Sequence, residues 1–481
     1  MLDNRNTTLM MDEYELTMAS AYHADPRMRN RKAAFSVFFR RVPDNGAYAV
    51  LAGIEQAIRY LENMRFDTED IAYLRGQNKY SDEFLDWLAD FRFEGDVTFV
   101  PEGTTVYPNT PLMTVVAALP PAQLAETAIL AQINHQSLIA TKTARIVRSA
   151  DGRPVSDFGA RRAHNVDAAV YGARAAYLAG AASTATVLAG QRFDIPIGGT
   201  MAHSWVMAYG DELEAFRIFA HTYPHCATLL VDTYDVVEGC RKAIKVFDEM
   251  KAEMGDDFGP YGIRIDSGDL ARLSRVARGM LDSAGHLDAK IVLSNSLDEF
   301  TIRSLLAQHA EVDAFGVGER LITASSEPVF GAVYKLVAIE DDHGVMQPRI
   351  KVSENVEKIT NPNVTHLWRA TLEDDPNTCV DIVSDDVPNA EGEHIQVVDP
   401  KRPWKILHVM TDSLESLDVS VYVGKHPVKL PSLQEIRLRC LKHLNALPEG
   451  EKRLENPQEH QVCMTPEYYE RKMELLRRYQ A

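Results

Sequence analysis

Between about residues 145 and 335, short apolar runs alternate with amphipathic helical patterns. This alternation is typical of β/α units, in which parallel strands are connected by helices. The apolar runs predict strands at residues 228–231, 262–265, 290–293 and 313–315. The amphipathic patterns predict one helix at 236–250 and a second that follows Asp269 and runs to about residue 282. Ser296 and Glu299 have the spacing of a capping box, which predicts the start of the following helix. The middle of the chain therefore predicts a parallel, barrel-like α/β domain.

The four predicted strands end in polar or glycine residues. The first two are followed by Asp232 and Asp266, the third by Ser294-Asn295, and the fourth by Gly316-x-Gly318. A single aspartate in such a place is usually only a helix cap. In a parallel barrel, however, the C-terminal ends of the strands converge on one face, where the chemistry takes place. The series of four predicts one shared pocket.

The two flanks follow a different pattern, and we interpret them as one discontinuous α/β domain around the barrel. Strands are expected at residues 33–40, 96–100, 334–339, 349–352 and 363–370, with a further pair within 104–118; helices are expected at 49–63, 82–91 and 121–148, and toward the C-terminus. The predicted boundaries are residues 1–145 and 336–481 for the discontinuous domain and 146–335 for the barrel.

The charge balance narrows the class of partner. The 481 residues include 51 Lys and Arg against 69 Asp and Glu, a net charge of −18, which argues against binding to nucleic acid or to an anionic membrane. We expect no signal peptide or membrane span. The five cysteines form no C-x-x-C pair, so we expect no disulfide framework and no structural zinc site, and a cytoplasmic location.

A glycine-rich run at residues 197–204 ends in a histidine, His203. The two glycines allow backbone amides to approach a ligand, and Thr200 adds a hydroxyl. A neutral histidine can act as a nucleophile or as a base. The alternative interpretation is a Gly-Gly turn followed by a histidine that caps a helix.

Two further segments carry candidate chemistry. Phe158 could stack on a planar ring, and Arg161 could bind a carboxylate or phosphate; alternatively, they are a core ring and a solvated arginine. Arg264 and Asp266 suit a sugar phosphate with Mg²⁺, whereas the alternative is an ordinary Asp-Ser-Gly turn. The amides of Gly316-x-Gly318 could face a phosphate oxygen. The chain contains no P-loop motif.

Together these segments resemble the nicotinate phosphoribosyltransferases, a family of type II phosphoribosyltransferases. The motifs that carry the resemblance lie at residues 12–18, 157–162, 199–204, 231–235, 264–269, 316–318, 333–336 and 357–360. They span almost the whole chain in the same order, which makes coincidence improbable.

The resemblance implies a reaction in which nicotinate and 5-phosphoribosyl 1-diphosphate give nicotinate mononucleotide and diphosphate, coupled to ATP hydrolysis, in the salvage route to NAD. It also implies an irregular α/β barrel beside an open-faced α/β sandwich, Mg²⁺, and a homodimer with shared active sites.

The resemblance further implies a role for each matching residue. His203 corresponds to the histidine that ATP transiently phosphorylates, and it acts with Arg264 and Asp266 in catalysis. Phe158 and Tyr14 sandwich the pyridine ring, Tyr14 coming from the partner subunit, although an early aromatic is most often core. The remaining contacts to the ring, ribose and phosphates come from Arg161, Thr200, Gly316, Gly318 and Thr360.

Residues 184–186 bear on the choice between nicotinate and nicotinamide, and two other functions are possible for a chain of this pattern. Relatives that use nicotinamide carry Thr-Asp-Thr where this chain has Thr184-Ala185-Thr186. The missing carboxylate removes repulsion toward the nicotinate carboxylate, which favours nicotinate over nicotinamide. A barrel lyase or aldolase would need a lysine or metal cluster at a strand end, and none stands out. A non-catalytic ligand-binding relative remains the other alternative.

Overall fold

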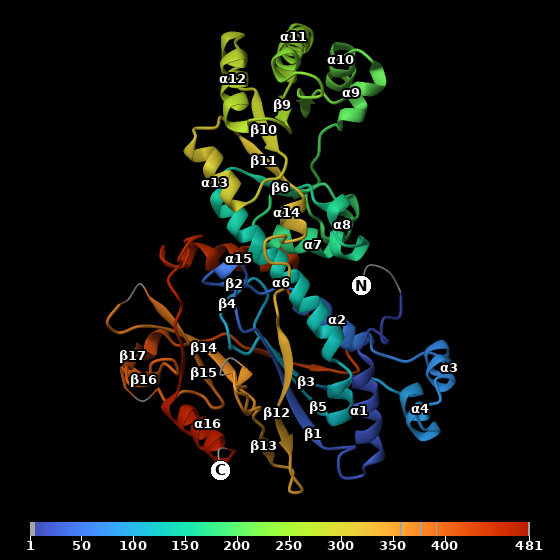
Figure 1. Cartoon of the computed structure of the whole chain (residues 1–481), viewed down its shortest axis with the longest axis vertical. Coiled ribbons are helices and arrows are strands. Elements are labelled where there is room, and N and C mark those ends of the chain that lie inside the picture. Colours follow the sequence, from blue (N-terminus) through green and yellow to red (C-terminus); the bar gives the residue numbers. More distant parts are fainter. Residues whose placement is uncertain (1–4, 356–357, 376–377, 391, 480–481) are drawn as a thin grey trace. The chain divides into compact units, whose positions relative to one another are not determined.

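The computed structural model describes residues 5–355, 358–375, 378–390 and 392–479, and it has a mixed α/β fold (Figure 1). The chain divides into two compact units: unit 1 comprises Met1–Thr141 and Val329–Ala481, and unit 2 comprises Lys142–Pro328. The sequence placed these boundaries at 145/146 and 335/336. The first of these positions lies inside helix α6 (Glu126–Ser149). The second lies inside strand β12 (Val333–Glu340), which belongs to unit 1 because it pairs with a strand of that unit.

Unit 2 is built on a six-stranded sheet in which every neighbouring pair is parallel. Its order is β7 (Ser183–Thr184), β6 (Val155–Asp157), β11 (Ala314–Val317), β10 (Lys290–Ser294), β9 (Tyr261–Ile265) and β8 (Ala227–Leu230). Strands β8 to β11 confirm the four strands that the sequence predicted. In the described part of the chain, β7 and β8 are the two edges, so the sheet is open.

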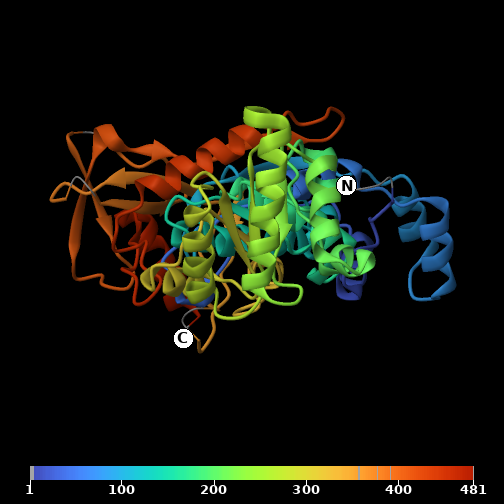
Figure 2. The same ribbon diagram turned by 90° about the horizontal axis from the view of Figure 1, so that it is seen from above.

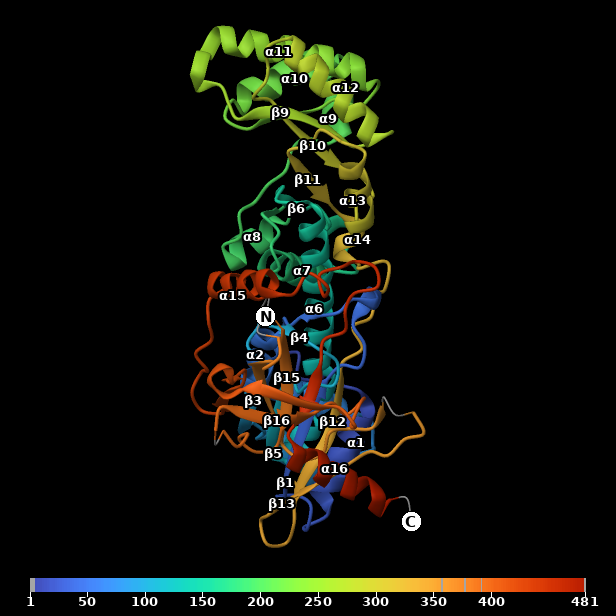
Figure 3. The same ribbon diagram turned by 90° about the vertical axis from the view of Figure 1, so that its left-hand side faces the viewer.

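Helices connect the parallel strands of unit 2. They are α7 (Val166–Leu178), α8 (Val187–Phe193), α9 (His203–Tyr209), α10 (Glu212–Thr222), α11 (Val236–Met254), α12 (Leu270–Ser283), α13 (Glu299–Ala307) and α14 (Glu319–Ile322). Helices α10, α11 and α12 lie side by side (Figures 2 and 3). The predicted helices at 236–250 and up to 282 are confirmed as α11 and α12.

The predicted capping box before α13 is wrong. Asp298 is the N-cap, and its carboxylate accepts a hydrogen bond of 2.7 Å from the amide of Thr301. Ser296 instead has a positive φ of 52° and donates to the side chain of Asn295. The carboxylate next to the helix therefore caps it, and the serine lies in the preceding turn.

Unit 1 contains an antiparallel sheet made from both ends of the chain. Its order is β13 (Met346–Pro348), β12, β1 (Lys32–Phe38), β5 (Met113–Ala118), β3 (Gly95–Phe99) and β19 (Val419–Val423). The sequence predicted a strand at 349–352, but β13 ends at Pro348. Three residues later the amide of Lys351 donates to the hydroxyl of Thr360, so a side chain takes the hydrogen bond that a ladder would need.

A second sheet in unit 1 is formed by the C-terminal half of the chain. Its order is β17 (Ile406–Met410), β16 (His394–Val398), β20 (Val462–Met464), β15 (Cys379–Ser384), β14 (His366–Thr371) and β18 (Glu415–Ser416). Its core includes Val380, Ile382, Val397 and Val409, all fully buried. The predicted strand at 363–370 is observed as β14.

Helices cover the rest of unit 1. They are α1 (Glu13–Ala24), α2 (Ile54–Asn63), α3 (Thr68–Gly76), α4 (Asp82–Ala89), α5 (Leu119–Gln123), α6, α15 (Leu433–Ala446) and α16 (Pro466–Arg478). The predicted helix at 49–63 starts only at Ile54, because Gly53 has a positive φ of 93°. Before it, β2 (Ala49–Val50) pairs with β4 (Thr105–Val106).

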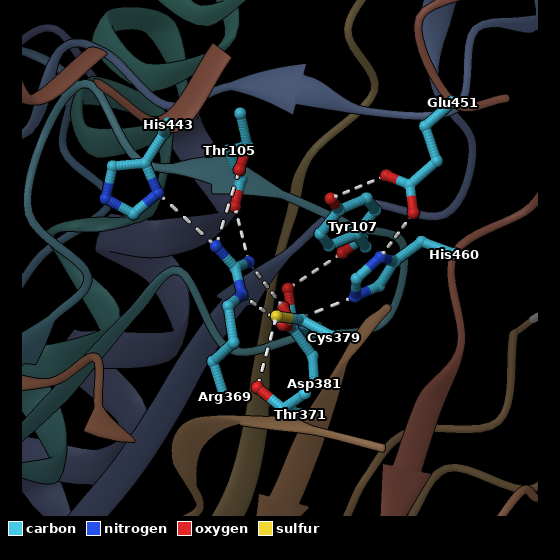
Figure 4. Close-up of polar contacts among 10 residues, drawn as sticks. Thr105, Tyr107, Arg369, Thr371, Cys379, Asp381, His443, Glu451 and His460 are labelled. Carbon is cyan, nitrogen blue, oxygen red and sulfur yellow. Dashed lines mark hydrogen bonds and ion pairs between the residues drawn. The ribbon is translucent and has the colours of Figure 1, made fainter. Parts of the chain in front are cut away.

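A buried polar network joins β14 and β15 to the N-terminal part of unit 1 (Figure 4). The guanidinium of Arg369 donates from Nε and Nη2 to Asp381 at 2.7 and 3.0 Å, and from Nη2 to the carbonyl of Thr105 at 2.9 Å. His460 lies 3.4 Å from Asp381 through Nε2 and 2.9 Å from Glu451 through Nδ1. Although burial raises it, the charges of Arg369 and His460 hold the pKa of Asp381 at about 2. Asp381 therefore stays ionised although it is buried.

Helix character and cysteine state complete the description of the fold. None of the described helices combines the length and apolar character needed to cross a membrane. All five cysteines lie within the described residues, and each is a free thiol.

Candidate active site

The polar ends of β8 to β11 form one continuous row in unit 2. The amide of Asp266 donates to Asp232 Oδ2 at 3.0 Å, and the hydroxyl of Ser294 donates to Asp266 Oδ1. In the neighbouring strand, Gly316 is paired with Ser294. The predicted convergence of the four strand ends is confirmed.

Arg264 lies in β9, two residues before Asp266 at the end of this row, and the charge of Asp266 acts on its guanidinium. The Nε atom of Arg264 is buried and has no hydrogen-bond partner among the described residues. Burial lowers the pKa of Arg264, the charges of Asp266 and Asp232 raise it, and the charge of Arg161 lowers it. A buried cation with an unused donor, next to a second cation, is suited to an anionic ligand.

His203 is the first residue of α9 and lies over the same row. Its Nδ1 atom is 3.1 Å from the hydroxyl oxygen of Thr233, and its Nε2 atom is 3.7 Å from Asp266 Oδ2. The N-cap of α9 is Ala202, and no side chain caps the helix. The interpretation of His203 as a capping histidine is therefore wrong, and its imidazole faces the carboxylate instead.

Phe158 follows β6 and lies beside β11. Its amide donates to the carbonyl of Val317 at 2.8 Å, and its ring occupies the space that a side chain on Gly316 would need. Its carbonyl would be 3.2 Å from a Cβ on Gly318. The ring is only partly buried, so it is not a core phenylalanine. Arg161 lies in the short 3-10 helix η2 (Ala160–Arg162) and is exposed.

The Thr184-Ala185-Thr186 segment is hydrogen-bonded to Asp157 at the end of β6. Asp157 is buried and accepts a hydrogen bond of 2.8 Å from the hydroxyl of Thr184, while its carbonyl accepts one of 2.8 Å from the amide of Ala185. Burial raises the pKa of Asp157, and the bonds from the Gly159 amide and Thr184 lower it. Ala185 itself is exposed, so this segment presents a methyl group where a carboxylate would stand.

The glycine-rich run is anchored at the same place. The amide of Gly198 donates to the carbonyl of Thr184 at 3.0 Å, and the hydroxyl of Thr200 donates to the carbonyl of Met201 at 3.3 Å. The run therefore follows α8, is hydrogen-bonded to the end of β7, and leads into α9, which carries His203.

Two of the predicted site residues belong to unit 1, whereas the row of strand ends belongs to unit 2. Tyr14 lies on α1 and is 44% exposed, so it is not a core residue; burial and the charge of Glu126 raise its pKa. Thr360 is buried and its hydroxyl accepts the amide of Lys351 at 3.0 Å. Glu357, part of the same motif, lies outside the described residues.

Sequence reasoning missed one contact of His203 and one support of Phe158. Thr233 directly follows the strand-end aspartate Asp232, but nothing in the sequence distinguishes its hydroxyl from those of its neighbours. Asp157 belongs to a recognised motif, yet only the structure shows that its carboxylate holds Thr184 and the amide of Gly159.

The described residues contain no group of three or more His, Cys, Asp or Glu side chains that could hold a metal ion. Two carboxylates are nevertheless adjacent in the row. The Oδ1 atom of Asp232 is buried without a hydrogen-bond partner among the described residues, beside Asp266. A pair of carboxylates fits Mg²⁺, which is usually held by one or two carboxylates together with substrate phosphates.

A parallel sheet whose strand ends carry a cation and two carboxylates, with the histidine of α9 beside them, defines an α/β protein with a site suited to a phosphorylated ligand. Comparison with known proteins names the family. Models of the nicotinate phosphoribosyltransferase N-terminal domain, family and C-terminal domain match residues 9–134, 154–374 and 365–472. The chain belongs to the nicotinate phosphoribosyltransferase family.

Individual relatives agree with this assignment. The chain is 40% identical to the nicotinate phosphoribosyltransferase of Bacillus subtilis (strain 168), over 98% of this chain and 95% of the relative. It is 33% identical to nicotinate phosphoribosyltransferase 2 of Arabidopsis thaliana, over 96% and 93% of the two chains. The crystal structure of human nicotinic acid phosphoribosyltransferase superposes with a TM-score of 0.81 at 26% identity, covering 97% of this chain and 99% of the other.

Proposed function

We propose that this protein transfers the phosphoribosyl group of 5-phosphoribosyl 1-diphosphate to nicotinate, giving nicotinate mononucleotide and diphosphate for NAD salvage. The observation that carries the proposal is the row of strand ends, in which Arg264, Asp266 and His203 meet next to Gly316. Family membership gives this row its substrates.

Arg264 and the carboxylates have distinct parts in the proposed reaction. The pyridine nitrogen attacks the anomeric carbon of the ribose as the bond to diphosphate breaks. The Arg264 guanidinium, whose buried Nε has no hydrogen-bond partner in the described part of the chain, binds the phosphate charge together with Arg161. Such preorganised charge is worth far more in a dry site than in water. Within unit 2, the amides at Gly316 and Gly318 and the hydroxyl of Thr200 complete the proposed phosphate and ribose contacts. For Thr360, which belongs to unit 1, a phosphate contact stays a prediction from the family resemblance.

Magnesium is the metal that suits this set of donors. Asp232 and Asp266 would hold it through their carboxylates, because Oδ1 of Asp232 has no other partner among the described residues. When bound, Mg²⁺ neutralises charge on the diphosphate leaving group.

His203 is the proposed point of coupling to ATP. An imidazole that is 40% exposed and whose Nε2 faces Asp266 at 3.7 Å is accessible to a nucleotide phosphate. Transient phosphorylation of His203 would link ATP hydrolysis to an otherwise poorly favourable synthesis.

Nicotinate is favoured over nicotinamide by the residue at position 185. Ala185 is exposed at the end of β7, next to the segment that carries Phe158. A carboxylate at this position would repel the carboxylate of nicotinate, and alanine removes that repulsion. Stacking of the pyridine ring on Phe158 completes this side of the proposed substrate site.

The same resemblance supports a larger assembly. We infer a homodimer with shared active sites, in which Tyr14 of one subunit closes the ring site of the other; its 44% exposure supports this. The open parallel sheet supports an incomplete barrel, and the antiparallel sheet of unit 1 supports the open-faced sandwich. Free thiols throughout support a reducing compartment such as the cytoplasm.

A coupled assay tests the function directly. Purified protein receives 5-phosphoribosyl 1-diphosphate, Mg²⁺ and radiolabelled nicotinate or nicotinamide, with and without ATP. We expect mononucleotide from nicotinate only, and more of it with ATP. Product only from nicotinamide contradicts the assigned substrate, and equilibrium binding without turnover identifies a non-catalytic relative.

The variant His203→Ala tests the coupling. We expect a folded protein that forms product without hydrolysing ATP, since the phosphate acceptor is absent. If this variant hydrolyses ATP in step with product formation as the wild type does, His203 is not the acceptor.

A further inference from the structure

The two ring nitrogens of His203 face different groups. Nδ1 is within hydrogen-bond distance of the Thr233 hydroxyl, at 3.1 Å, whereas Nε2 is 3.7 Å from Asp266 Oδ2, beyond hydrogen-bond distance. Thr233 is half-buried and follows Asp232 at the end of β8. The Nδ1 edge of the imidazole is therefore held by the protein, and the Nε2 edge points toward the row of strand ends.

This geometry separates the two nitrogens as acceptors of a phosphoryl group. A phosphorus atom bonded to Nδ1 would have to take the place of the Thr233 hydroxyl. Nε2 meets no such obstacle, because its neighbour is a carboxylate beyond bonding distance and the side chain of His203 is 40% exposed. In a neutral imidazole, the nitrogen that carries the proton is set by the hydrogen bond that it makes.

We propose that Thr233 is a positioning residue: its hydroxyl oxygen accepts the Nδ1–H of His203, which leaves the lone pair on Nε2 as the phosphoryl acceptor. The proposal rests on the proposed coupling to ATP. The Nε2 lone pair forms a bond to the γ-phosphorus of a nucleoside triphosphate. The bond from that phosphorus to the β,γ-bridging oxygen breaks, and its electron pair leaves on the nucleoside diphosphate. The Nδ1 proton stays on the ring, and Thr233 holds the resulting imidazolium in place.

The first test needs no substrate. Histidine-labelled protein in its unliganded form is compared by ¹⁵N NMR for wild type, Thr233→Val and Thr233→Ser. We expect His203 protonated on Nδ1 in the wild type and in Thr233→Ser. In Thr233→Val we expect the mixed tautomers of a free imidazole, because valine keeps the shape but lacks the acceptor. An Nε2-protonated wild type, or a Thr233→Val spectrum identical to that of the wild type, overturns the proposal.

The second test locates the phosphate. After incubation with γ-labelled ATP, phosphohistidine isomers are resolved by ³¹P NMR and by isomer-specific antibodies. We expect the wild type to carry phosphate on Nε2. Thr233→Val should be labelled about tenfold more slowly, the scale of one lost hydrogen bond to a charged group, and Thr233→Ser should recover most of that rate. Phosphate on Nδ1 in the wild type overturns the proposal.

The two tests also separate this proposal from the proposed function. If the wild type takes up no phosphate at all, the coupling to ATP fails, but the tautomer of the unliganded enzyme still decides whether Thr233 positions the ring. If phosphate is taken up on Nε2 at equal rates in all three proteins, the coupling stands and the role of Thr233 is refuted.

Discussion

A Cβ atom on Gly316 would lie 2.4 Å from Cε2 of Phe158, so the ring rests on a strand position that has no side chain. The ring is proposed to stack on the pyridine of the substrate, and its position depends on that absence. Gly316→Ala should therefore displace the ring, raise the KM for nicotinate several-fold, and cost about 1–3 kcal/mol of unfolding free energy, the usual price of overpacking.

Steady-state kinetics and urea unfolding measure both effects of Gly316→Ala. The matched control is Gly279→Ala in α12, where nothing lies within 4 Å of the added Cβ; it should leave the KM unchanged. An unchanged KM in Gly316→Ala would show that the ring does not contact the substrate.

Arg369→Met should destabilise unit 1 strongly. It leaves Asp381, which is fully buried, without its main counter-charge, and breaking such a pair typically costs about 3–5 kcal/mol. Urea unfolding monitored by circular dichroism measures the loss.

Two further variants serve as controls for Arg369→Met. In the double variant Arg369→Met/Asp381→Leu, most of the loss should disappear because the unpaired charge is gone. Arg27→Met removes an exposed ion pair with Asp25 and should have no measurable effect. Equal stability of Arg369→Met and wild type would refute the structural role of the network.

The pH dependence of stability should report on His443. Burial, followed by the charge of Arg369, lowers the pKa of His443 from 6.5 to about 4. The folded protein therefore keeps this ring neutral, while the unfolded chain binds a proton below about pH 6.5. As the pH falls from about 6.5 to 4, the wild type should lose about 2–3 kcal/mol of unfolding free energy relative to His443→Gln. The difference between the two proteins, measured at each pH, isolates this ring; a constant difference contradicts the prediction.

Ala185→Asp should shift the substrate preference toward nicotinamide. The added carboxylate would repel the carboxylate of nicotinate and leave the neutral amide unaffected. We expect the ratio of kcat/KM for nicotinamide over nicotinate to rise about tenfold, equivalent to about 1.4 kcal/mol. Ala185→Asn, which has the same shape without the charge, serves as the control, and an equal shift in both variants would rule out an electrostatic cause.

Regular periodicity made much of unit 2 predictable. Its central strands are short apolar runs bounded by polar residues, and this pattern located β8 to β11 to within a few residues of their observed ends. Because neighbouring parallel strands place their C-terminal ends together, the row from Asp232 to Gly316 also followed from the sequence. The exact first residue of a helix was harder to predict. Either Ser296 or Asp298 could cap α13, and only the observed local geometry distinguishes them.

Contacts between distant segments were beyond the reach of the sequence. Tyr107 donates a hydrogen bond to Glu451, which lies 344 positions further along the chain, and no local pattern pairs these two residues. The contact of Thr233 with His203 spans only 30 positions, but it depends on the direction of one hydroxyl at a strand end. Long-range side-chain geometry is a product of packing, and periodicity does not record it.

The interrupted path of the chain through unit 1 has a consequence for its synthesis. Strands β1, β3 and β5 leave the ribosome early, but their partners β12 and β19 follow only after all of unit 2 has been made. Unit 2 is contiguous and can fold as soon as it emerges. Until β12 and β19 have been synthesised, β1 and β3 each lack one neighbouring strand. Such unpaired strand edges are prone to aggregation. Chaperone demand during translation should therefore concentrate on the first 120 or so residues, and a circular permutant that joins both parts of unit 1 should reduce it.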